Sequence, residues 1–483
     1  MLAVGSSYTD KDRYAAQPGG ELTTEVGICQ VFSPVGRRNP SGENSMSKSD
    51  ERVAMFLCDI HWKTLPSEVQ DHVVRCAIDL FGAVIAGTAT PMAGIGRNIA
   101  KRHFPGGDAS ILMTPERASL PGAVLANGLA VNALDIDDGH RLIKGHPGAV
   151  IFPAVLAAAE QQEAGLQAFL TALVAAYEVA IRAGLAMQRH YDYYHSSGAW
   201  GAVGAAAGAA KIFGLTEEET VCALATADFH APMVPVMRSV AFPSHCKDGA
   251  GWGAMTGILA ALLAKEGFTG GPSIFACPAG EDLTADLGNH YEIMDLYFKS
   301  HTCCRWTHPA IRAVLDLRRT HGFSPRDIQR VRILTFQASA SLYRRKPRNT
   351  EEAQYNGVYP VAAALVAGEV GPRQVLGAFL ADPDVLALMD RIEVLTDERC
   401  ERAFPAQRLC EVEVTTADGG VLRSGVYHAA GEPEEPVTLP WIVDKFLWLT
   451  RDVLPRERAD ALIGLLTSPA DDPPIRRILA LVR

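Results

Sequence analysis

Several features that mark membrane, secreted or nucleic-acid-binding proteins are missing from this sequence. The most membrane-like run, "SSGAWGAVGAAAGAA", is mostly glycine and alanine, which suits close helix packing better than contact with lipid. The first residues include no apolar segment of the kind found in signal peptides. The formal net charge is −10, so no broad basic surface for nucleic acid is expected. We therefore predict neither a membrane nor a nucleic acid as a partner.

The cysteine spacings of disulfide frameworks and metal sites are also missing. Of the ten cysteines, only Cys303 and Cys304 form a close pair, and adjacent cysteines seldom bridge each other. We predict a reduced, intracellular protein with no bound metal. A cytoplasmic location is favoured, with a mitochondrial one left open.

The sequence does contain ample apolar material for a large core. It has 483 residues, of which 48% are hydrophobic and 21% charged. We expect a disordered polar tail at residues 1–48 and the first part of a helical domain at residues 49–308. A smaller α+β domain should follow at residues 309–432, and residues 433–483 should be helices that complete the helical domain. The predicted fold class is therefore mainly α.

Cap signals indicate where two of the helices begin. Ser67 and Gln70 have capping-box spacing before a run of apolar residues at helical intervals. Thr216 is the expected cap of a helix with three glutamates in its first turn, where the helix dipole favours negative charge. The stripes of alanine and glycine in later helices are interpreted as core packing.

Between residues 309 and 432 the helical pattern of apolar residues gives way to strand-like stretches. The stretches "IQRVRILTF" and "RIEVL" have strand character, and "CEVEVTTADGGVLRSGVY" reads as a hairpin that turns at Asp418-Gly419-Gly420. Between the strands, "TEEAQYNGVYPVAAALVAG" is expected to be helical.

Ionisable side chains are concentrated in the stretch "ALDIDDGHRLIKGHPGAV". Asp135, Asp137 and Asp138 cannot all be ionised in one dry pocket without cationic partners. His146 precedes Pro-Gly, which places it at a turn or a helix start, and His140 lies nearby. An ordinary acidic loop and an acid–base site explain this stretch about equally well.

Three other stretches hold isolated candidates. His195 precedes a Gly/Ala helix, whose open N–H groups favour an anion, although a satisfied loop histidine is the simpler interpretation. His245 and Lys247 lie in a glycine-rich turn before another helix, where a surface lysine is the usual state. Tyr359 opens an apolar helix and is equally explained as a core tyrosine.

A cluster of cationic and histidine side chains lies where the helical pattern gives way to the α+β pattern. Its members are Lys299, His301, Arg305 and His308. Domain junctions are common ligand sites. The neighbouring Cys303 and Cys304 have no second ligand pair at a suitable spacing, so they do not indicate a metal site.

Taken together, five motifs in order resemble the MmgE/PrpD family, which includes 2-methylcitrate dehydratase, cis-aconitate decarboxylase and iminodisuccinate epimerase. The resemblance runs from about residue 52 to the end of the sequence, and any one motif alone would be weak. The motifs are "ALDIDDGH…GHPGAVIFPAVLAAAE", "HSSGAWGAVGAAAGAAKIFGL", "CKDGAGWGAMTGILAALLAKEGFTGGPSIF", "LYFKSHTCCRWTHPAI" and "AQYNGVYPVAAALVAG".

The resemblance implies a large helical domain, a smaller α+β lid, and an active site in the cleft between them. It also implies a homodimer that uses no metal or organic cofactor. By motif, the catalytic residues would be Asp135, His146, His195 and Tyr359, and the substrate-binding residues Lys247, Lys299, His140 and Cys304.

Some positions match the family less securely. Lys247 aligns within a residue of the family's lysine, and Arg238 or His245 would be its substitutes. Gly139 stands where the decarboxylases can carry a hydroxyl residue, and Cys304 where they can carry histidine. These departures bear on the particular substrate, which the resemblance does not specify.

The implied chemistry is proton transfer at a carbon next to a carboxylate. Lysines would neutralise the substrate carboxylates, and histidines, with Asp135 orienting or polarising an imidazole, would move the proton. A cofactor-independent lyase of a small tricarboxylate is expected. Decarboxylation of a cis-aconitate type is slightly favoured over dehydration of a 2-methylcitrate type, because "GHPGAV" is closer to the decarboxylase pattern. An epimerase of an amino- or imino-dicarboxylate and an inactive binding protein on the same fold are the alternatives.

Overall fold

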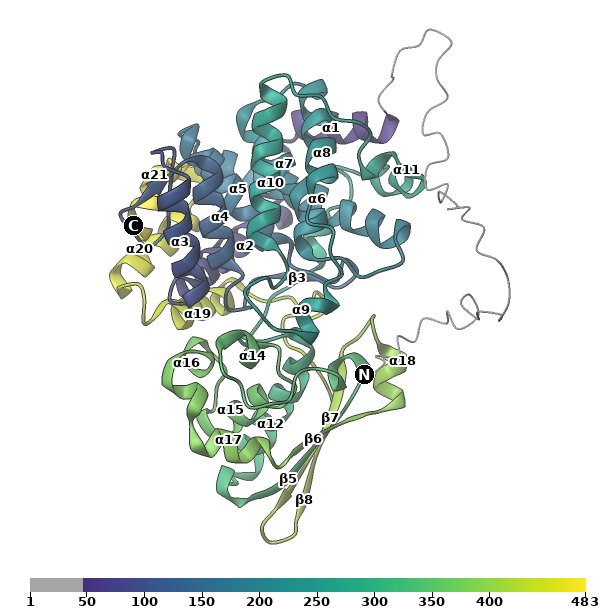
Figure 1. Ribbon diagram of the computed structural model, residues 1–483, viewed down its shortest axis with the longest axis vertical. Helices are drawn as coiled ribbons and strands as arrows, with labels where there is room; N and C mark the ends of the chain where they lie inside the picture. The colour runs from purple at the N-terminus through teal and green to yellow at the C-terminus, as the bar shows by residue number, and fades with distance from the viewer. Residues whose placement is uncertain (1–46) are drawn as a thin grey trace, which may run out of the picture. The chain divides into compact units, whose positions relative to one another are not determined.

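The structure, a computed structural model, describes residues 47–483 (Figure 1). The tail predicted at residues 1–48 therefore lies almost wholly outside the described residues. Ser47 and Lys48 are described, and both belong to the start of the first helix. The Ser47 hydroxyl accepts a hydrogen bond from the Asp50 backbone N–H and so caps that helix.

Helices dominate the chain up to residue 284, and two short β-ladders interrupt them. The helices are α1 (Lys48–Asp59), α2 (Ser67–Gly87), α3 (Pro91–His103), α4 (Leu120–Val131), α5 (Pro147–Gln161), α6 (Leu166–His190), α7 (Ser197–Phe213), α8 (Glu217–His230), α9 (Met237–Ala241), α10 (Ala250–Lys265) and α11 (Pro278–Thr284). The ladders pair β1 (Ala109–Ser110) with β2 (Arg117–Ala118), and β3 (Gly139–His140) with β4 (Leu296–Tyr297).

One of the two predicted helix caps is present. Thr216 caps α8 through its hydroxyl, and the Glu219 carboxylate accepts a hydrogen bond from the Thr216 N–H. The capping box at Ser67 and Gln70 is wrong, because Pro66 holds the cap position of α2. The Gln70 amide instead donates to the carbonyls of Trp62 and Leu65, which ties the preceding 3-10 turn to the helix.

Small residues let the central helix α7 approach its neighbours closely, as the alanine and glycine stripes predicted. α7 packs against α5, α6 and α10. A Cβ atom at Gly201 would lie 2.7 Å from the Val150 side chain of α5, so a larger residue there would force the two helices apart.

α6 is long and apolar enough, by length and composition, to cross a membrane, which the sequence analysis did not anticipate. Within its most apolar window, 89% of the residues are buried inside the protein. α6 packs against α7, α5 and α2. Its composition is that of a largely buried core helix, whose apolar residues pack against the neighbouring helices.

The segment from residue 308 to residue 428 forms the α+β part, with a four-stranded sheet of order β6-β5-β7-β8. β5 pairs in parallel with β6 and antiparallel with β7, and β8 is antiparallel to β7. Its elements are α12 (His308–His321), β5 (Ile328–Thr335), α13 (Gln337–Ala340), α14 (Thr350–Gln354), α15 (Tyr359–Ala367), α16 (Pro372–Val375), α17 (Pro383–Met389), β6 (Ile392–Thr396), α18 (Glu398–Ala403), β7 (Leu409–Thr416) and β8 (Val421–His428).

The predicted strands and hairpin are confirmed, and so is the mainly α fold class with a smaller α+β part. The single helix expected from residue 350 to residue 368 is wrong: the chain breaks at residues 355–358, between α14 and α15. Pro360 in the first turn of α15 has no N–H to donate to the Asn356 carbonyl, so the helical hydrogen bonds cannot run on from α14. The Asn356 side chain accepts the N–H groups of Val358 and Tyr359 in place of helical carbonyls.

After the sheet, the chain returns to the first helices. α19 (Leu439–Thr450) and α20 (Arg456–Leu466) both contact α2, and α21 (Ile475–Leu479) contacts α5. In Figure 1 these yellow C-terminal helices lie beside the blue α2–α4, and the green sheet lies apart from both. The β3–β4 ladder lies where the helical elements meet the α+β part, because it pairs residues 139–140 with 296–297.

Candidate active site

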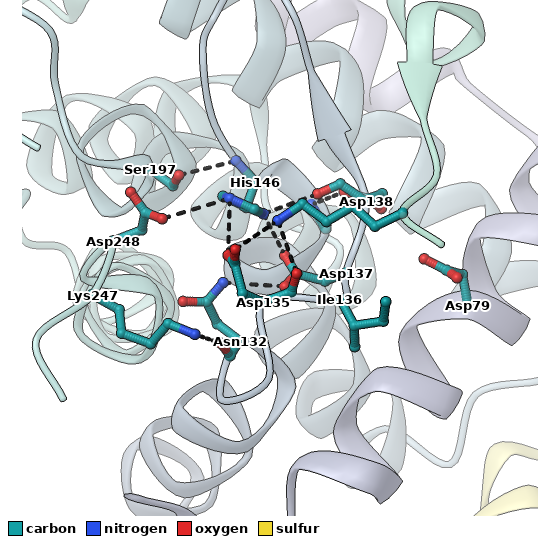
Figure 2. Close-up of polar contacts among 12 residues, drawn as sticks. Asp79, Asn132, Asp135, Ile136, Asp137, Asp138, His146, Ser197, Lys247 and Asp248 are labelled. Carbon is teal, nitrogen blue, oxygen red and sulfur yellow. Dashed lines mark hydrogen bonds and ion pairs between the residues drawn. The ribbon is translucent and has the colours of Figure 1, made fainter. Parts of the chain in front are cut away.

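His146 stands at the centre of a buried group of carboxylates. It occupies the N-cap position of α5, and its backbone N–H donates to the Ser197 hydroxyl at 3.0 Å. On one side of the ring, Nδ1 lies 3.0 Å from Asp137 Oδ2. On the other, Nε2 lies 3.5 Å from Asp135 Oδ1 and 3.6 Å from Asp248 Oδ2. Figure 2 shows the three carboxylates around the imidazole.

This arrangement raises the pKa of His146. Burial and the nearby Lys299 lower the pKa of the imidazole, but the Asp137 and Asp135 carboxylates outweigh them and raise the pKa above its usual 6.5. Burial alone would raise the pKa of Asp137, yet His146 holds the pKa of that carboxyl down at about 2. An imidazolium held against an aspartate is suited to act as a general acid.

Lys299 joins the group from the segment after β4. Its ammonium lies 3.1 Å from Asp135 Oδ2 and donates to the Asp135 carbonyl at 2.9 Å. Burial by itself lowers the pKa of Lys299, but Asp135 holds that pKa above its usual range. Both side chains are buried, so the pair neutralises two charges that would be costly alone.

Lys247 is held differently. Its ammonium donates to the carbonyls of Asn132 and Ala133 and to the Gln354 side-chain oxygen at 2.8 Å. These three acceptors use all three of its N–H groups. Of the substitutes considered for it, Arg238 is exposed and His245 is exposed near Glu351.

Three residues of this region have a left-handed backbone that side chains other than glycine rarely adopt. The φ angles are +53° at Asp135, +55° at Lys144 and +40° at Lys247. Such conformations cost of order 1–3 kcal/mol each and persist where the surrounding structure enforces them, often at functional sites. Half of the six such residues between 47 and 483 therefore belong to this one region.

A cavity of about 50 Å³ opens at the exposed side of this group, at the junction with the α+β part. That volume has room for only a few water molecules. Its lining combines carboxylates, cations and aromatic rings: Asp135, Lys144, Gly145, His146, Tyr194, Val236, Val240, Asp248, Tyr297, Lys299, Cys304, Arg305, Trp306, Tyr355 and Arg408.

Comparisons with known proteins identify the family of this chain. The family model of the MmgE/PrpD N-terminal domain matches residues 51–285, and that of the MmgE/PrpD C-terminal domain matches residues 301–467. The chain belongs to the MmgE/PrpD family.

The similar proteins of this family include cis-aconitate decarboxylases. A cis-aconitate decarboxylase-like protein of Aspergillus oryzae, oryM, is 24% identical, covering 90% of this chain and 98% of the relative. The cis-aconitate decarboxylase of Homo sapiens is 23% identical, covering 82% and 86%. That of Aspergillus terreus is 21% identical, covering 88% and 95%.

Of the family-implied residues, four line the cavity and a fifth holds its wall. Asp135, His146, Lys299 and Cys304 line it directly. Burial raises the pKa of the Cys304 thiol to about 12, so this cysteine is a neutral contact. Lys247 lies behind the wall and ties residues 132–133 to α14.

The structure places Tyr359 elsewhere and brings in Tyr355 instead. The Tyr359 hydroxyl donates to the Gln374 carbonyl at 2.7 Å, inside the α+β part. Tyr355, in the break before α15, lines the cavity with its hydroxyl 3.5 Å from Asp248 Oδ2. In this structure Tyr355, and not Tyr359, lines the cavity, so the predicted role of Tyr359 in the site stays a prediction.

Two predicted histidines also lie outside the cavity lining. His195 packs against the rings of Tyr191 and Tyr193, and burial with nearby Lys144 lowers its pKa to about 4. His140 lies in the β3–β4 ladder, where burial and neighbouring arginines lower its pKa to about 3. Neither side chain lines the cavity, and their roles at the site stay predictions.

The close approach of Tyr297 explains why residue 139 is a glycine. A Cβ atom at residue 139 would collide with the ring and hydroxyl of Tyr297. The aromatic side chain therefore fills the space beside the cavity that a larger residue would occupy, and only glycine leaves room for it.

Buried groups beneath the cavity position the aspartate loop. Lys445 of α19 donates to the Ile136 carbonyl at 2.8 Å and pairs with Asp79 of α2. Asp138 accepts hydrogen bonds from the Tyr177 hydroxyl and, at 3.0 Å, from the Gly148 N–H. Burial raises the pKa of Asp138 to about 7.

Sequence reasoning missed four residues of this arrangement: Asp248, Tyr355, Arg408 and Lys445. Asp248 directly follows Lys247, and Tyr355 precedes an Asn-Gly turn signal, so both had a local clue. Arg408 and Lys445 had none, because only the tertiary fold brings them to the loop.

Asp135, His146 and Asp248 also have the spacing of metal ligands, with ligand atoms within 4.8 Å of one another. The Lys299 ammonium, 3.1 Å from Asp135, already provides a positive charge there. A divalent cation would have to share Asp135 with that ammonium and displace the proton of His146. The donor set is thus better matched to proton transfer than to metal binding.

Proposed function

We propose that this protein is a cofactor-independent lyase that decarboxylates cis-aconitate or a closely similar tricarboxylate. The observation that carries the proposal is the position of His146, which lies against the Asp137 and Asp135 carboxylates that raise its pKa and lines a small cavity that also contains cations. The cis-aconitate decarboxylases among its relatives support the same choice.

The proposed reaction uses these groups as follows. The bond to one CO₂ group breaks, and its electron pair becomes a new carbon–carbon double bond. The original double bond shifts its electrons to the carbon beside a second carboxylate, and His146 donates a proton to that carbon. The Asp137 carboxylate stabilises the imidazolium before transfer.

Substrate entry requires the cavity to enlarge. Its volume of about 50 Å³ suits a few water molecules, whereas a tricarboxylate is several times larger. Because the wall combines helical elements with the α+β part, we propose that the two separate slightly to admit the substrate.

The alternatives draw less support from the geometry. An epimerase needs proton-transfer groups on both faces of one carbon, whereas among residues 47–483 His146 is the one histidine that lines the cavity. A binding protein would not require a carboxylate-held proton. Dehydration uses the same acid and stays the second candidate.

The direct test is product analysis in D₂O by proton NMR with cis-aconitate, 2-methylcitrate and iminodisuccinate as separate substrates. We expect CO₂ release from cis-aconitate, with one deuterium incorporated beside a carboxylate. Water loss from 2-methylcitrate alone would move the assignment to dehydration, and inversion of iminodisuccinate alone would move it to epimerisation. The His146→Gln variant is the control for contaminating activity.

We also propose that the protein acts as a homodimer through an apolar face on α3, α8 and α10. Trp252 is 57% exposed, Phe229 85% and Ile95 50%. A groove of about 450 Å³ runs between α3, α4 and α10 beside them. Exposed apolar faces of this kind are typical of subunit contacts.

Light scattering with size-exclusion chromatography tests the dimer. Wild type should have twice the mass of one chain, and Trp252→Lys should shift it toward the monomer at low micromolar concentration. Val421→Lys is the matched control, because Val421 is 54% exposed on β8, away from this face. A monomeric wild type would contradict the proposal.

A further inference from the structure

Arg408 is a buried cation with no carboxylate partner among residues 47–483. It lies between α18 and β7 in the α+β part and lines the cavity. It is only 6% exposed, and its Nε and Nη1 groups have no hydrogen-bond partner. Among residues 47–483, no carboxylate forms an ion pair with it. Removing this guanidinium from water costs free energy, and no ion pair with the protein offsets that cost.

Three other cations at the site already have ion-pair or hydrogen-bond partners within the protein. Lys299 is paired with Asp135, and Lys247 is saturated by two carbonyls and an amide oxygen. Arg305 is paired with Glu432 at 2.8 Å. The positive charge available to an incoming anion is therefore concentrated at Arg408.

The surroundings of Arg408 favour an anion. Its guanidinium lies 5.7 Å from the ring centroid of Tyr297. Lys144 lines the same cavity from the helical side, with its ammonium 5.2 Å from the ring centroid of Tyr194. Burial and the positive charge of Arg408 lower the pKa of Lys144. The two cations therefore repel each other, and an anion bound between them would relieve that repulsion.

We propose that Arg408 and Lys144 form a carboxylate subsite that binds the substrate carboxylate farthest from His146. The guanidinium would donate to the carboxylate from the α+β part, and Lys144 would contact it from the helical side. Bound in this way, the anion links the two parts of the molecule. The subsite rests on the proposed function for its tricarboxylate, but its anion binding can be measured without turnover.

The test is calorimetric binding of unreactive acids to the full-length protein. The probes are tricarballylate, which has three carboxylates, and glutarate and methylsuccinate, each lacking a different one of them. We expect Arg408→Gln to weaken tricarballylate about ten- to a hundredfold, since a charge-assisted hydrogen bond is lost. At least one dicarboxylate should bind wild type and variant equally, because it lacks the carboxylate that Arg408 contacts.

Two further variants complete the design. Arg402→Gln removes an exposed arginine of α18 and should leave all affinities unchanged. Arg408→Lys keeps the charge without the planar fork and should bind tricarballylate with intermediate affinity. If Arg408→Gln does not fold, the comparison of Arg408→Lys with wild type carries the test.

The outcomes separate this inference from the proposed function. Equal tricarballylate affinity in wild type and variant overturns the subsite, as does an equal loss for all three acids or a wild type that binds none at millimolar concentration. Arg408-dependent binding without turnover of cis-aconitate would keep the subsite and reject the proposed reaction. Turnover of cis-aconitate by wild type, together with unchanged tricarballylate affinity in Arg408→Gln, would keep the proposed reaction and reject the subsite.

Discussion

The two walls of the cavity differ in how their charges are compensated. In the inner wall, formed by Asp135, His146, Asp248 and Lys299, opposite charges lie within 4 Å of each other. In the outer wall, formed by Lys144, Tyr194 and Arg408, the cations face aromatic rings and have no carboxylate partner among residues 47–483.

The difference shows how a protein can hold a reactive centre in place before its substrate arrives. In the inner wall the protein's own opposite charges neutralise each other, so the wall keeps its geometry when no substrate is bound. The cations of the outer wall have no carboxylate partner, so an incoming anion interacts most favourably there. The free energy of substrate binding therefore comes mainly from contacts away from the reacting carbon.

The largest effect should follow removal of the proton donor from the inner wall. We expect His146→Gln to lower kcat about 10²–10⁴-fold, the usual contribution of a general acid. Circular dichroism should stay unchanged, because glutamine can still reach the Asp137 carboxylate. Turnover within a few-fold of wild type would remove His146 from the mechanism.

Lys299→Met should affect both activity and stability, unlike any change to the outer wall. It leaves the buried Asp135 charge uncompensated, which costs about 3–5 kcal/mol of unfolding free energy. Catalytic efficiency should fall about ten- to a hundredfold. Urea denaturation and steady-state kinetics measure the two effects.

A matched double variant sharpens this result. Adding Asp135→Asn to Lys299→Met removes the orphaned charge, so part of the lost stability should return while activity stays low. Unchanged stability in the single variant would mean that the ion pair contributes nothing to the fold.

The pH dependence should report the proton on His146. Because the acid form reacts, kcat should fall as pH rises through the raised pKa of His146, above 6.5. Asp137→Asn removes a carboxylate that raises this pKa and should move the fall to lower pH. A pH profile identical to that of wild type would contradict the role of Asp137.

The same proton has a consequence for stability. A folded-state pKa raised above the unfolded value means that the proton stabilises the fold fully below about pH 6.5 and that this stabilisation is lost as pH rises through the folded pKa. Unfolding free energies of wild type and His146→Gln should therefore converge at high pH.

The two tyrosines of the 355–359 segment allow a smaller contrast. Tyr355→Phe removes a hydroxyl at the cavity and should lower kcat/KM by a few-fold to about tenfold. Tyr359→Phe removes a hydrogen bond to the Gln374 carbonyl and should cost about 1 kcal/mol of stability without changing kcat. The reverse result would restore Tyr359 to the active site.

The smallest expected effect is that of metal removal. EDTA treatment should leave activity unchanged, because Lys299 provides the positive charge beside Asp135. Elemental analysis of the purified protein, before and after chelation, checks this. A stoichiometric metal whose loss abolishes turnover would assign the Asp135, His146 and Asp248 cluster to metal binding instead.

Much of the fold could be predicted because its signals are local. Thr216 and Glu219 are three residues apart and cap α8 by themselves, and the Asp-Gly-Gly turn sets the β7–β8 hairpin. The helix expected across residues 350–368 failed where two local signals competed. Its alanines favour helix, but Pro360 has no N–H to continue the helical hydrogen bonds from the segment before α15.

The candidate site was predictable only in part, for the same reason. His146 and Asp135 share one short loop, and the ordered motifs pointed to both. The roles of Lys247 and His195 could not be read from their neighbours in sequence. Lys247 is saturated by carbonyls of residues 132–133, and His195 is enclosed by tyrosine rings.

The sequence by itself determined the family, the mainly α fold class and the loop that holds the acid–base pair, since these depend on ordered motifs and short-range periodicity. The tertiary structure decided which charges compensate each other. It brings Lys299 to Asp135, Lys445 to the Ile136 carbonyl and Arg408 to the cavity from positions more than 150 residues away. Whether a buried charge is neutralised or left free for a substrate depends on distances of a few ångströms, and only the folded chain sets those distances.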